Sequence, residues 1–191
     1  ASPVESDPTD RDAYAQTKLI QEQLIRDFRS HYDARVVFIR PGMIYGREDL
    51  WHALLGMKAG DKTWLCIAPQ ARMPMTYVEN CAQAIVKAAE SKTAEGQTLN
   101  IVDDNPPKRK TYIKELSKQA NIPVKIVPIG WLIMASITNF AWFINQTFLG
   151  NKARLPGLLV PAKLQARFKP LRYENRLAKE VLGWTPQYSL D

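Results

Sequence analysis

The chain has 191 residues, a hydrophobic fraction of 46% and a net charge of +7. This length and apolar content are typical of a folded domain with a packed core and exclude a disordered segment. Two cysteines, Cys66 and Cys81, are too few for a disulfide framework or a zinc site, so we expect a reducing, cytoplasmic environment and no metal. His31 and His52 are isolated, and we interpret both as ordinary residues rather than ligands.

The first predicted elements are a helix over residues 12–28 and a buried strand over residues 35–40. The strand has an apolar centre, residues 36–39, and stops at Pro41-Gly42. In the helix, several residues recur at a spacing of three or four, and we expect them to form its buried stripe: Thr17, Ile20, Leu24 and Phe28.

Tyr14 and Lys18 stand four residues apart in this helix, which places them on one face, one turn apart. On the helical wheel Tyr14 falls at the edge of the expected buried stripe, which predicts a half-sheltered phenol. A nearby ammonium group stabilises a phenolate, and such a phenol is a usable acid or base. The spacing alone is a weak signal, because it occurs by chance on many helices.

Short apolar runs alternate with helical patterns along the rest of the chain, which is typical of βαβ units and a mainly parallel sheet. The strands are predicted at residues 64–68, 98–102 and 124–127. The helices are predicted at residues 78–90, 111–120 and 175–182, with Thr111 capping the second, Gly183 closing the third, and Trp184 packing the chain back. We expect two regions, residues 1–102 and a mainly helical, substrate-binding region over residues 103–191.

The stretch from residue 126 to residue 151 contains no charged residue and is rich in large apolar side chains. Proline, glycine and amide residues interrupt it, which disfavours a membrane span of about 20 apolar residues. We favour a buried or pocket-lining helix that turns Trp131, Phe140 or Trp142 toward Tyr14. An interfacial membrane contact and a true span are the alternatives.

A basic run follows this stretch with no acidic residue between its members: Lys152, Arg154, Lys163, Arg167, Lys169 and Arg172. A solvated face is the simplest interpretation, and an anionic substrate group or membrane headgroups are the alternatives. These charges lack interleaved aromatic residues and any recognition motif, so nucleic acid is not expected as a partner.

Four ordered motifs carry a resemblance to a known family. They are residues 5–8 followed by the Tyr14/Lys18 pair, residues 40–46 (Arg-Pro-Gly-Met-Ile-Tyr-Gly), residues 75–84 with the strand at 96–102, and residues 178–186. Together they resemble the extended short-chain dehydrogenase/reductases, the NAD-dependent epimerase/dehydratase family. Residues 77–80 are faintly similar to its 3β-hydroxysteroid dehydrogenase-like branch, although the family usually has an aspartate pair where this chain has Glu79-Asn80.

The resemblance implies an α/β fold with the second half of a Rossmann-like parallel sheet, and a role for each matching residue. Tyr14 would exchange a proton with a substrate hydroxyl or carbonyl group, and Lys18 would bind the nicotinamide ribose of NAD or NADP. Four residues would lie along the nicotinamide: Pro41, Gly42, Met43 and Ile44. Arg47 and Arg72 are candidates for binding an anionic substrate group, with plain surface charge as the alternative.

The function implied by the resemblance is an NAD(P)-dependent oxidoreductase or epimerase/dehydratase. A nucleotide-linked sugar would suit the arginines as substrate, whereas a lipid-like alcohol would suit the uncharged aromatic stretch. A redox-inactive ligand-binding protein and a membrane-surface protein of the same fold are the alternatives, and a homodimer is left open.

Two features depart from the family pattern. No G-x-G-x-x-G occurs in the chain, and the family's catalytic Ser or Thr would stand before Ala1. The chain also opens without an initiator methionine or a signal peptide. We therefore interpret it as the C-terminal part of such a protein, without the first βαβ units, and expect that missing half as its partner.

Overall fold

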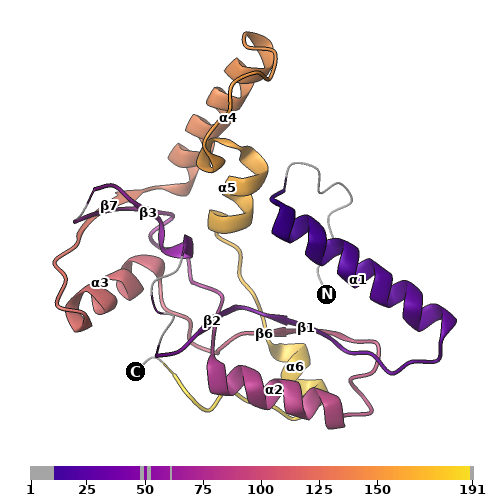
Figure 1. Ribbon diagram of the computed structural model, residues 1–191. Coiled ribbons are helices and arrows are strands. Elements are labelled where there is room, and N and C mark those ends of the chain that lie inside the picture. The colour runs from indigo at the N-terminus through magenta and orange to yellow at the C-terminus, as the bar shows by residue number, and fades with distance from the viewer. Residues whose placement is uncertain (1–10, 48–49, 51–52, 61, 190–191) are drawn as a thin grey trace.

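The computed structural model describes residues 11–47, 50, 53–60 and 62–189. The predicted motif at residues 5–8 and the isolated His52 lie outside the described residues. Figure 1 shows a body in which helices cover a small sheet, and a helical arm that projects from this body. The motif at residues 40–46 runs through the centre of the body, where the strands meet.

Four short strands form this centre: β1 (Phe38–Pro41), β2 (Met43–Tyr45), β5 (Met75–Tyr77) and β6 (Thr98–Ile101). β1 pairs with β6 and β2 pairs with β5, in both cases in parallel. The Gly42 N–H donates to the Ile101 carbonyl (2.8 Å) and the Met43 N–H to the Pro74 carbonyl (2.6 Å), so the chain changes its pairing partner at Gly42. The parallel, Rossmann-like sheet that the sequence predicts is confirmed.

Three helices cover this sheet from two sides (Figure 1): α1 (Ala13–His31), α2 (Val78–Glu90) and α6 (Arg176–Leu182). α2 and α6 share one side, where Leu99, Ile101 and Trp184 are fully buried. Gly183 ends α6 with φ at +56°, the left-handed conformation that favours glycine. The predicted closure of this helix and the packing of Trp184 are confirmed.

The face of α1 that contacts the sheet is not the predicted one. The expected stripe is exposed to solvent in the described structure: Thr17, Ile20, Leu24 and Phe28. The helix instead turns Glu22 and Arg26 toward the sheet, where they bind side chains of β1 and β6. Polar bonds of this kind set the rotation of the helix, and a hydropathy pattern does not report them.

A second small sheet and one more helix complete the body: η1 (Ala53–Leu55), β3 (Met57–Lys58), β4 (Thr63–Ile67), α3 (Arg109–Gln119) and β7 (Lys125–Ile129). β4 pairs in parallel with β7 and antiparallel with β3. Lys108 is the N-cap of α3, so the prediction that Thr111 caps this helix is wrong. β4 belongs to the predicted region 1–102 and β7 to the predicted region 103–191, so this small sheet joins the two regions. The division of the chain at residue 102 stays a prediction.

The arm consists of α4 (Trp131–Thr147), η2 (Gly157–Leu159) and α5 (Pro161–Phe168). One side of α4 packs on η2 and α5, with Thr138 Oγ1 donating to the Leu158 carbonyl (2.8 Å). Phe140 is 65% exposed, so the prediction that it is shielded in a pocket is wrong, while Trp131 and Trp142 are half-buried. No helix in the described ranges is long and apolar enough to cross a membrane.

Candidate functional site

Helix α1 is fixed to the sheet through the carboxylate of Glu22. Its two oxygens accept hydrogen bonds from Arg40 Nη2 at 2.8 and 3.0 Å, and Oε1 also accepts from Arg26 Nη2 at 2.6 Å. Arg26 donates further to Thr98 Oγ1 (3.1 Å) and lies over the ring of Phe38. Although burial acts to raise it, the bonds from the two arginines hold the pKa of Glu22 below its ordinary value. The carboxylate therefore ties α1 to the last residues of β1.

Tyr14 and Lys18 lie one turn apart near the start of α1. Lys18 Nζ is 5.8 Å from the centroid of the Tyr14 ring, within the range of a cation–π contact. Asp12 caps the helix by accepting a hydrogen bond from the Ala15 N–H (2.9 Å). The phenol is 73% exposed rather than half-sheltered, because the helix turns Glu22 toward the sheet instead of the predicted stripe. A ligand can therefore reach both polar groups of the pair from solvent.

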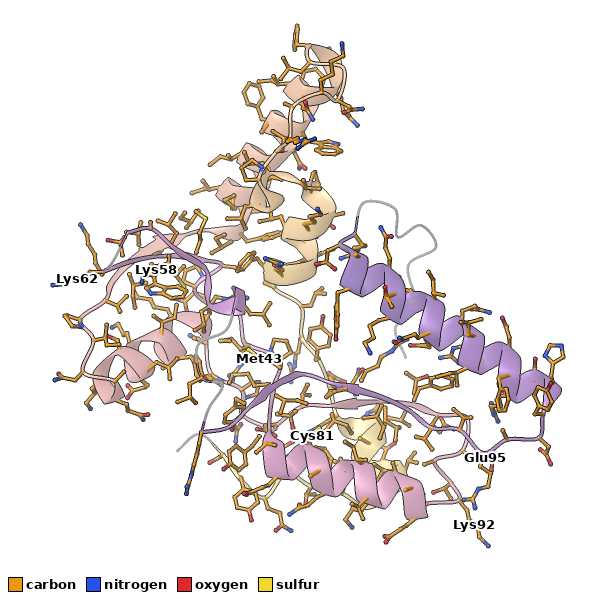
Figure 2. All side chains as sticks on the ribbon, in the orientation of Figure 1. Met43, Lys58, Lys62, Cys81, Lys92 and Glu95 are labelled. Carbon is orange, nitrogen blue, oxygen red and sulfur yellow. The ribbon has the colours of Figure 1, made fainter. Side chains whose placement is uncertain are left out.

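The Pro41-Gly42 turn lies where β1 ends and β2 begins. A Cβ at residue 42 would stand 2.6 Å from the carbonyl oxygen of Pro74, so the two backbones approach too closely for any residue but glycine. Met43 is buried in the middle of the body (Figure 2), whereas Pro41 and Ile44 are exposed. Of the four residues expected along a nicotinamide, Pro41 and Ile44 expose apolar side-chain surface to a ligand. The side chain of Met43 is buried in the core and does not.

An open cleft of about 600 Å³ lies just past the carboxyl end of β6. Its walls come from three segments that are far apart in the sequence: residues 72–74, 102–106 and 171–176. Arg72, Arg172 and Arg176 line it with exposed side chains, and none of the three forms an ion pair within the part of the chain that the structure describes. Guanidinium groups grouped in this way suit an anionic ligand group.

The acidic residues of the cleft do not cancel this charge. Asp104 accepts hydrogen bonds from Asn175 (2.8 Å) and Lys179 (2.7 Å), and despite its burial these bonds lower the pKa of Asp104. Asp103 is bound in a buried network. Glu174 is the exposed carboxylate that remains among the residues lining the cleft. The balance of unpaired charge in the cleft is therefore positive.

The predicted site residues do not all meet in one place. Arg72 lines the cleft and donates to the Pro106 carbonyl (3.0 Å), whereas Arg47, exposed beyond β2, is not among the lining residues. Tyr14 and Lys18 also lie outside the cleft, on α1. The sequence indicated Arg172 only as a member of the basic run and did not single out Arg176, because only the fold brings these residues next to Arg72.

A buried polar network adjoins the cleft and was not predicted. Asp103 accepts hydrogen bonds from the Tyr45 hydroxyl (3.1 Å), the Tyr77 N–H (3.0 Å) and Asn80 Nδ2 (2.9 Å). Burial raises the pKa of Asp103, although these bonds act to lower it. Burial and the nearby Asp103 carboxylate in turn raise the pKa of Tyr45. Across the described ranges, no three His, Cys, Asp or Glu side chains gather where they could hold a metal ion.

Residues 2–102 match a protein family described as the NAD dependent epimerase/dehydratase family. The matched part is more than half of the chain and contains Tyr14, Lys18, the Pro41-Gly42 turn and Arg72. No curated protein matches the chain.

Solved structures share the fold. UDP-glucuronic acid 4-epimerase from Bacillus cereus, in complex with UDP-glucuronic acid and NAD, is 20% identical, with a TM-score of 0.62 over 98% of this chain and 50% of its own. Epimerase Mth375 from Methanothermobacter thermautotrophicus is 14% identical, with a TM-score of 0.64 over 100% of this chain and 51% of its own. RMD from Pseudomonas aeruginosa, complexed with NADPH, is 16% identical, with a TM-score of 0.58 over 99% and 56%. The chain thus spans about half the length of these structures.

Proposed function

Because the chain belongs to the NAD dependent epimerase/dehydratase family, we propose that it is the catalytic part of an NAD(P)-dependent enzyme that acts on a hydroxyl or carbonyl group of a nucleotide-linked sugar. The observation that carries this proposal is the Tyr14/Lys18 pair, one turn apart on a helix that Glu22 ties to the end of β1. This geometry supports acid–base chemistry at the exposed start of α1.

Proton transfer is assigned to the Tyr14 hydroxyl. When a substrate alcohol is oxidised, the Tyr14 side chain acts as the phenolate: its oxygen takes the hydroxyl proton as hydride leaves the carbon, and the C–O bond becomes a carbonyl. In the reverse direction Tyr14 returns that proton to the carbonyl oxygen. The ammonium of Lys18 stabilises the negative charge on the phenol oxygen, and it would hold the ribose hydroxyls of a bound dinucleotide by hydrogen bonds.

The residues present fit a nicotinamide cofactor. Lys18 Nζ forms no ion pair within the described residues, so its three donors are available to ribose hydroxyls. Pro41, at the end of β1, and Ile44, in β2, expose apolar surface of the kind that a flat ring requires. When bound, NAD or NADP would supply the group that accepts or donates the hydride.

The cleft supports a nucleotide-linked sugar as the substrate class. A diphosphate needs cationic donors, which Arg72, Arg172 and Arg176 supply without competing ion pairs. The cleft also lies past the carboxyl end of a parallel strand, where open α/β sheets bind their ligands. The Bacillus cereus neighbour, which shares the fold, was solved with UDP-glucuronic acid and NAD. The arginines favour this class over a lipid-like alcohol.

The test uses the full-length protein encoded by the gene. Its turnover is measured with a panel of nucleotide-linked sugars, beginning with UDP-glucuronic acid. We expect Tyr14→Phe to keep dinucleotide binding, measured by calorimetry, and to lower turnover by about 10²–10⁴-fold, the usual effect of removing a general acid or base. Lys18→Ala should weaken dinucleotide binding and also lower turnover. Arg172→Gln should raise KM by roughly 10-fold with little change in kcat, because it removes a charge-assisted hydrogen bond to the bound substrate.

Tyr32→Phe is the matched control, because Tyr32 is an exposed tyrosine at the other end of α1 that contacts Phe28. It should leave turnover unchanged. Full turnover in Tyr14→Phe would contradict the assignment of Tyr14. Binding of a nucleotide-linked sugar without turnover of any panel member would instead favour the redox-inactive ligand-binding alternative.

A further inference from the structure

One side of α4 presents a mainly apolar face, with Ser136 among its exposed residues, and nothing in the described structure covers it. Its members recur at helical spacing and continue into the turn after the helix: Leu132, Ile133, Ile137, Phe140, Phe143, Phe148 and Leu149. We call these residues the α4 face. Leu132 and Phe148, at its two ends, are 77% and 73% exposed. A contiguous exposed apolar surface of this kind marks an interaction site.

The opposite side of α4 is held in place, so the helix cannot rotate to bury this face. Thr138 Oγ1 donates to the Leu158 carbonyl, and Asn145 Oδ1 accepts from the Ala153 N–H at 3.1 Å. Thr138 and Asn145 are both buried, and Met134 packs beside them against α5. The exposure of the α4 face is therefore a fixed property of the arm.

The charged residues of the arm itself are all basic. No acidic residue occurs between Glu115 and Glu174 in the sequence. Lys152 and Arg154 are exposed just past the apolar tip, and neither forms an ion pair within the described ranges. An apolar helix face bordered by unpaired lysine and arginine is the pattern of helices that lie in the interface of an anionic bilayer.

We propose that the α4 face docks on the surface of an anionic lipid bilayer, with its apolar side chains at the level of the headgroups and with Lys152 and Arg154 on lipid anions. A second copy of the chain fits this face less well, because a symmetric contact would bring the two sets of positive charge together. The arm projects from the body (Figure 1), so a flat surface can reach the face without meeting the sheet.

The orientation of the arm leaves the proposed catalytic pair free. α5 lies between α4 and α1 (Figure 1), and its Ala162 carbonyl accepts a hydrogen bond from Arg11 Nη1 (3.3 Å) just before α1 begins. The side of α4 that packs on α5 is therefore the side toward Tyr14, and the α4 face looks away from it. Docking to lipid and access of a ligand to α1 can occur together.

The experiment is flotation of the protein, as its gene encodes it, with vesicles of phosphatidylcholine alone and with vesicles that also contain phosphatidylserine. We expect the protein to float with the anionic vesicles and to stay in solution with the neutral ones. Phe140→Asp should reduce partitioning at least about 10-fold, because a charge replaces the inserted ring. The double variant Lys152→Glu/Arg154→Glu should reduce it at least about 25-fold, since each basic residue contributes a factor of about five near such a surface.

Two matched controls lie on the far side of the body. Val86→Asp replaces an apolar residue of α2 that is 56% exposed, and Lys92→Glu reverses a charge that Figure 2 places far from the arm. Both should float like the parent protein. Failure of the parent protein to float with phosphatidylserine vesicles would overturn the proposal. An equal loss in Val86→Asp would also overturn it, as would a dimer seen by sedimentation velocity without lipid that Phe140→Asp dissociates.

Discussion

Asn80 stands where the family's strand-to-helix element usually has the second of two aspartates, and its neighbours explain this departure. Its Nδ2 donates to Asp103 Oδ1 and to the Tyr188 carbonyl, both at 2.9 Å. Its Oδ1 accepts from the N–H groups of Gln187 (2.9 Å) and Tyr188 (3.1 Å). An aspartate would keep these acceptor bonds but would set a second carboxylate against Asp103. The amide of Asn80 offers a donor to the Asp103 carboxylate and an acceptor to the two backbone N–H groups.

We therefore expect Asn80→Asp to lower the free energy of unfolding by roughly 2–4 kcal/mol near neutral pH, because two donors are lost and two buried carboxylates repel. Burial raises the pKa of Asp103 above its ordinary 3.8, so the folded state binds this proton more tightly than the unfolded state. The stability linked to that proton is fully present below pH 3.8 and is lost as the pH rises through the raised folded pKa.

A second carboxylate raises the folded pKa of the pair further, so the deficit of the variant should shrink on acidification. Urea unfolding of parent and variant at about pH 7 and about pH 5 measures this difference. Asn139→Asp is the control, because Asn139 is exposed on α4 and should show no deficit at either pH. A deficit in Asn80→Asp that is equal at both pH values would show that repulsion is not its cause.

At the scale of elements, α1 owes its place on the sheet to the pairing of Glu22 with Arg40. Arg40 offers two nitrogens to one carboxylate, through Nη2 (2.8 and 3.0 Å) and Nε (3.3 Å). Tyr14 stands two turns before Glu22 on the same helix, so a shift of α1 at Glu22 also moves the phenol. Arg40 is in this sense a positioning residue for the proposed acid–base pair.

We expect Arg40→Gln to lower kcat roughly 10- to 100-fold with little change in the KM of the nucleotide-linked sugar, because a misplaced phenol affects proton transfer more than substrate binding. The ion pair is partly exposed, so the free energy of unfolding should fall by only about 1 kcal/mol. Arg40→Lys should restore part of kcat, since lysine keeps the charge but not the paired donors. Steady-state kinetics on the three proteins measures this.

Arg35→Gln is the matched control, because Arg35 precedes the same strand and its Nε lies 3.7 Å from Glu95 in a largely exposed pair. Its kcat should equal that of the parent. If Arg40→Gln raised KM with kcat unchanged, Arg40 would belong to substrate binding rather than to the placement of α1.

The elements differ in how far the sequence could predict them. The bounds of α2 and β6 were predicted to within one residue. The buried face of α2 was predicted wrongly, because the apolar positions expected there, Ala82, Ile85 and Ala89, are exposed, whereas Ala84 and Ala88 are buried. The spacing of Tyr14 and Lys18 was also predicted, since it depends only on local helical geometry. The rotation of α1 was not, because its partner Arg40 lies eighteen residues further along the chain from Glu22.

At the scale of the whole molecule, β1 and α1 each leave a surface uncovered in the described structure. β1 pairs with β6 along one edge, and no other strand in the described ranges pairs with it. The exposed side of α1 also carries large apolar residues: Ile20, Leu24, Ile25 and Phe28. An open strand edge and an apolar stripe together favour association with further polypeptide. The half of the related structures that this chain does not span is a candidate partner for both surfaces.

We expect the polypeptide of residues 1–191, made alone, to self-associate in sedimentation velocity and to show no NAD binding by calorimetry. The glycine fingerprint for the pyrophosphate is absent from these residues, so the dinucleotide has no site for that group in them. Leu24→Glu, on the exposed stripe, should reduce self-association, whereas Val86→Glu on α2 should not. A monomeric polypeptide that binds NAD tightly would contradict the interpretation of the missing half.

The cleft could not have been predicted, because it exists only where distant segments meet. Arg72 follows β4, Asp103 follows β6 and Arg172 follows α5, and no spacing in the sequence links them. The family resemblance indicated Arg72 as a candidate for substrate binding, but it did not indicate Arg172 or Arg176. The Tyr14/Lys18 pair lies on one helix, so its spacing could be found in the sequence. The cleft is lined by three distant segments, so finding it required the fold.

The parallel pairing of the strands also affects how the chain is made. In two of the three parallel ladders the partner strand is about sixty residues later in the sequence, since Phe38 pairs with Thr98 and Thr63 pairs with Lys125. At roughly 5–20 residues per second on the ribosome, β1 stays without its partner for about 3–12 s after it is synthesised. The apolar residues around Phe38 lack this strand partner for that time, so we expect this segment to be a binding site for a chaperone that acts during translation.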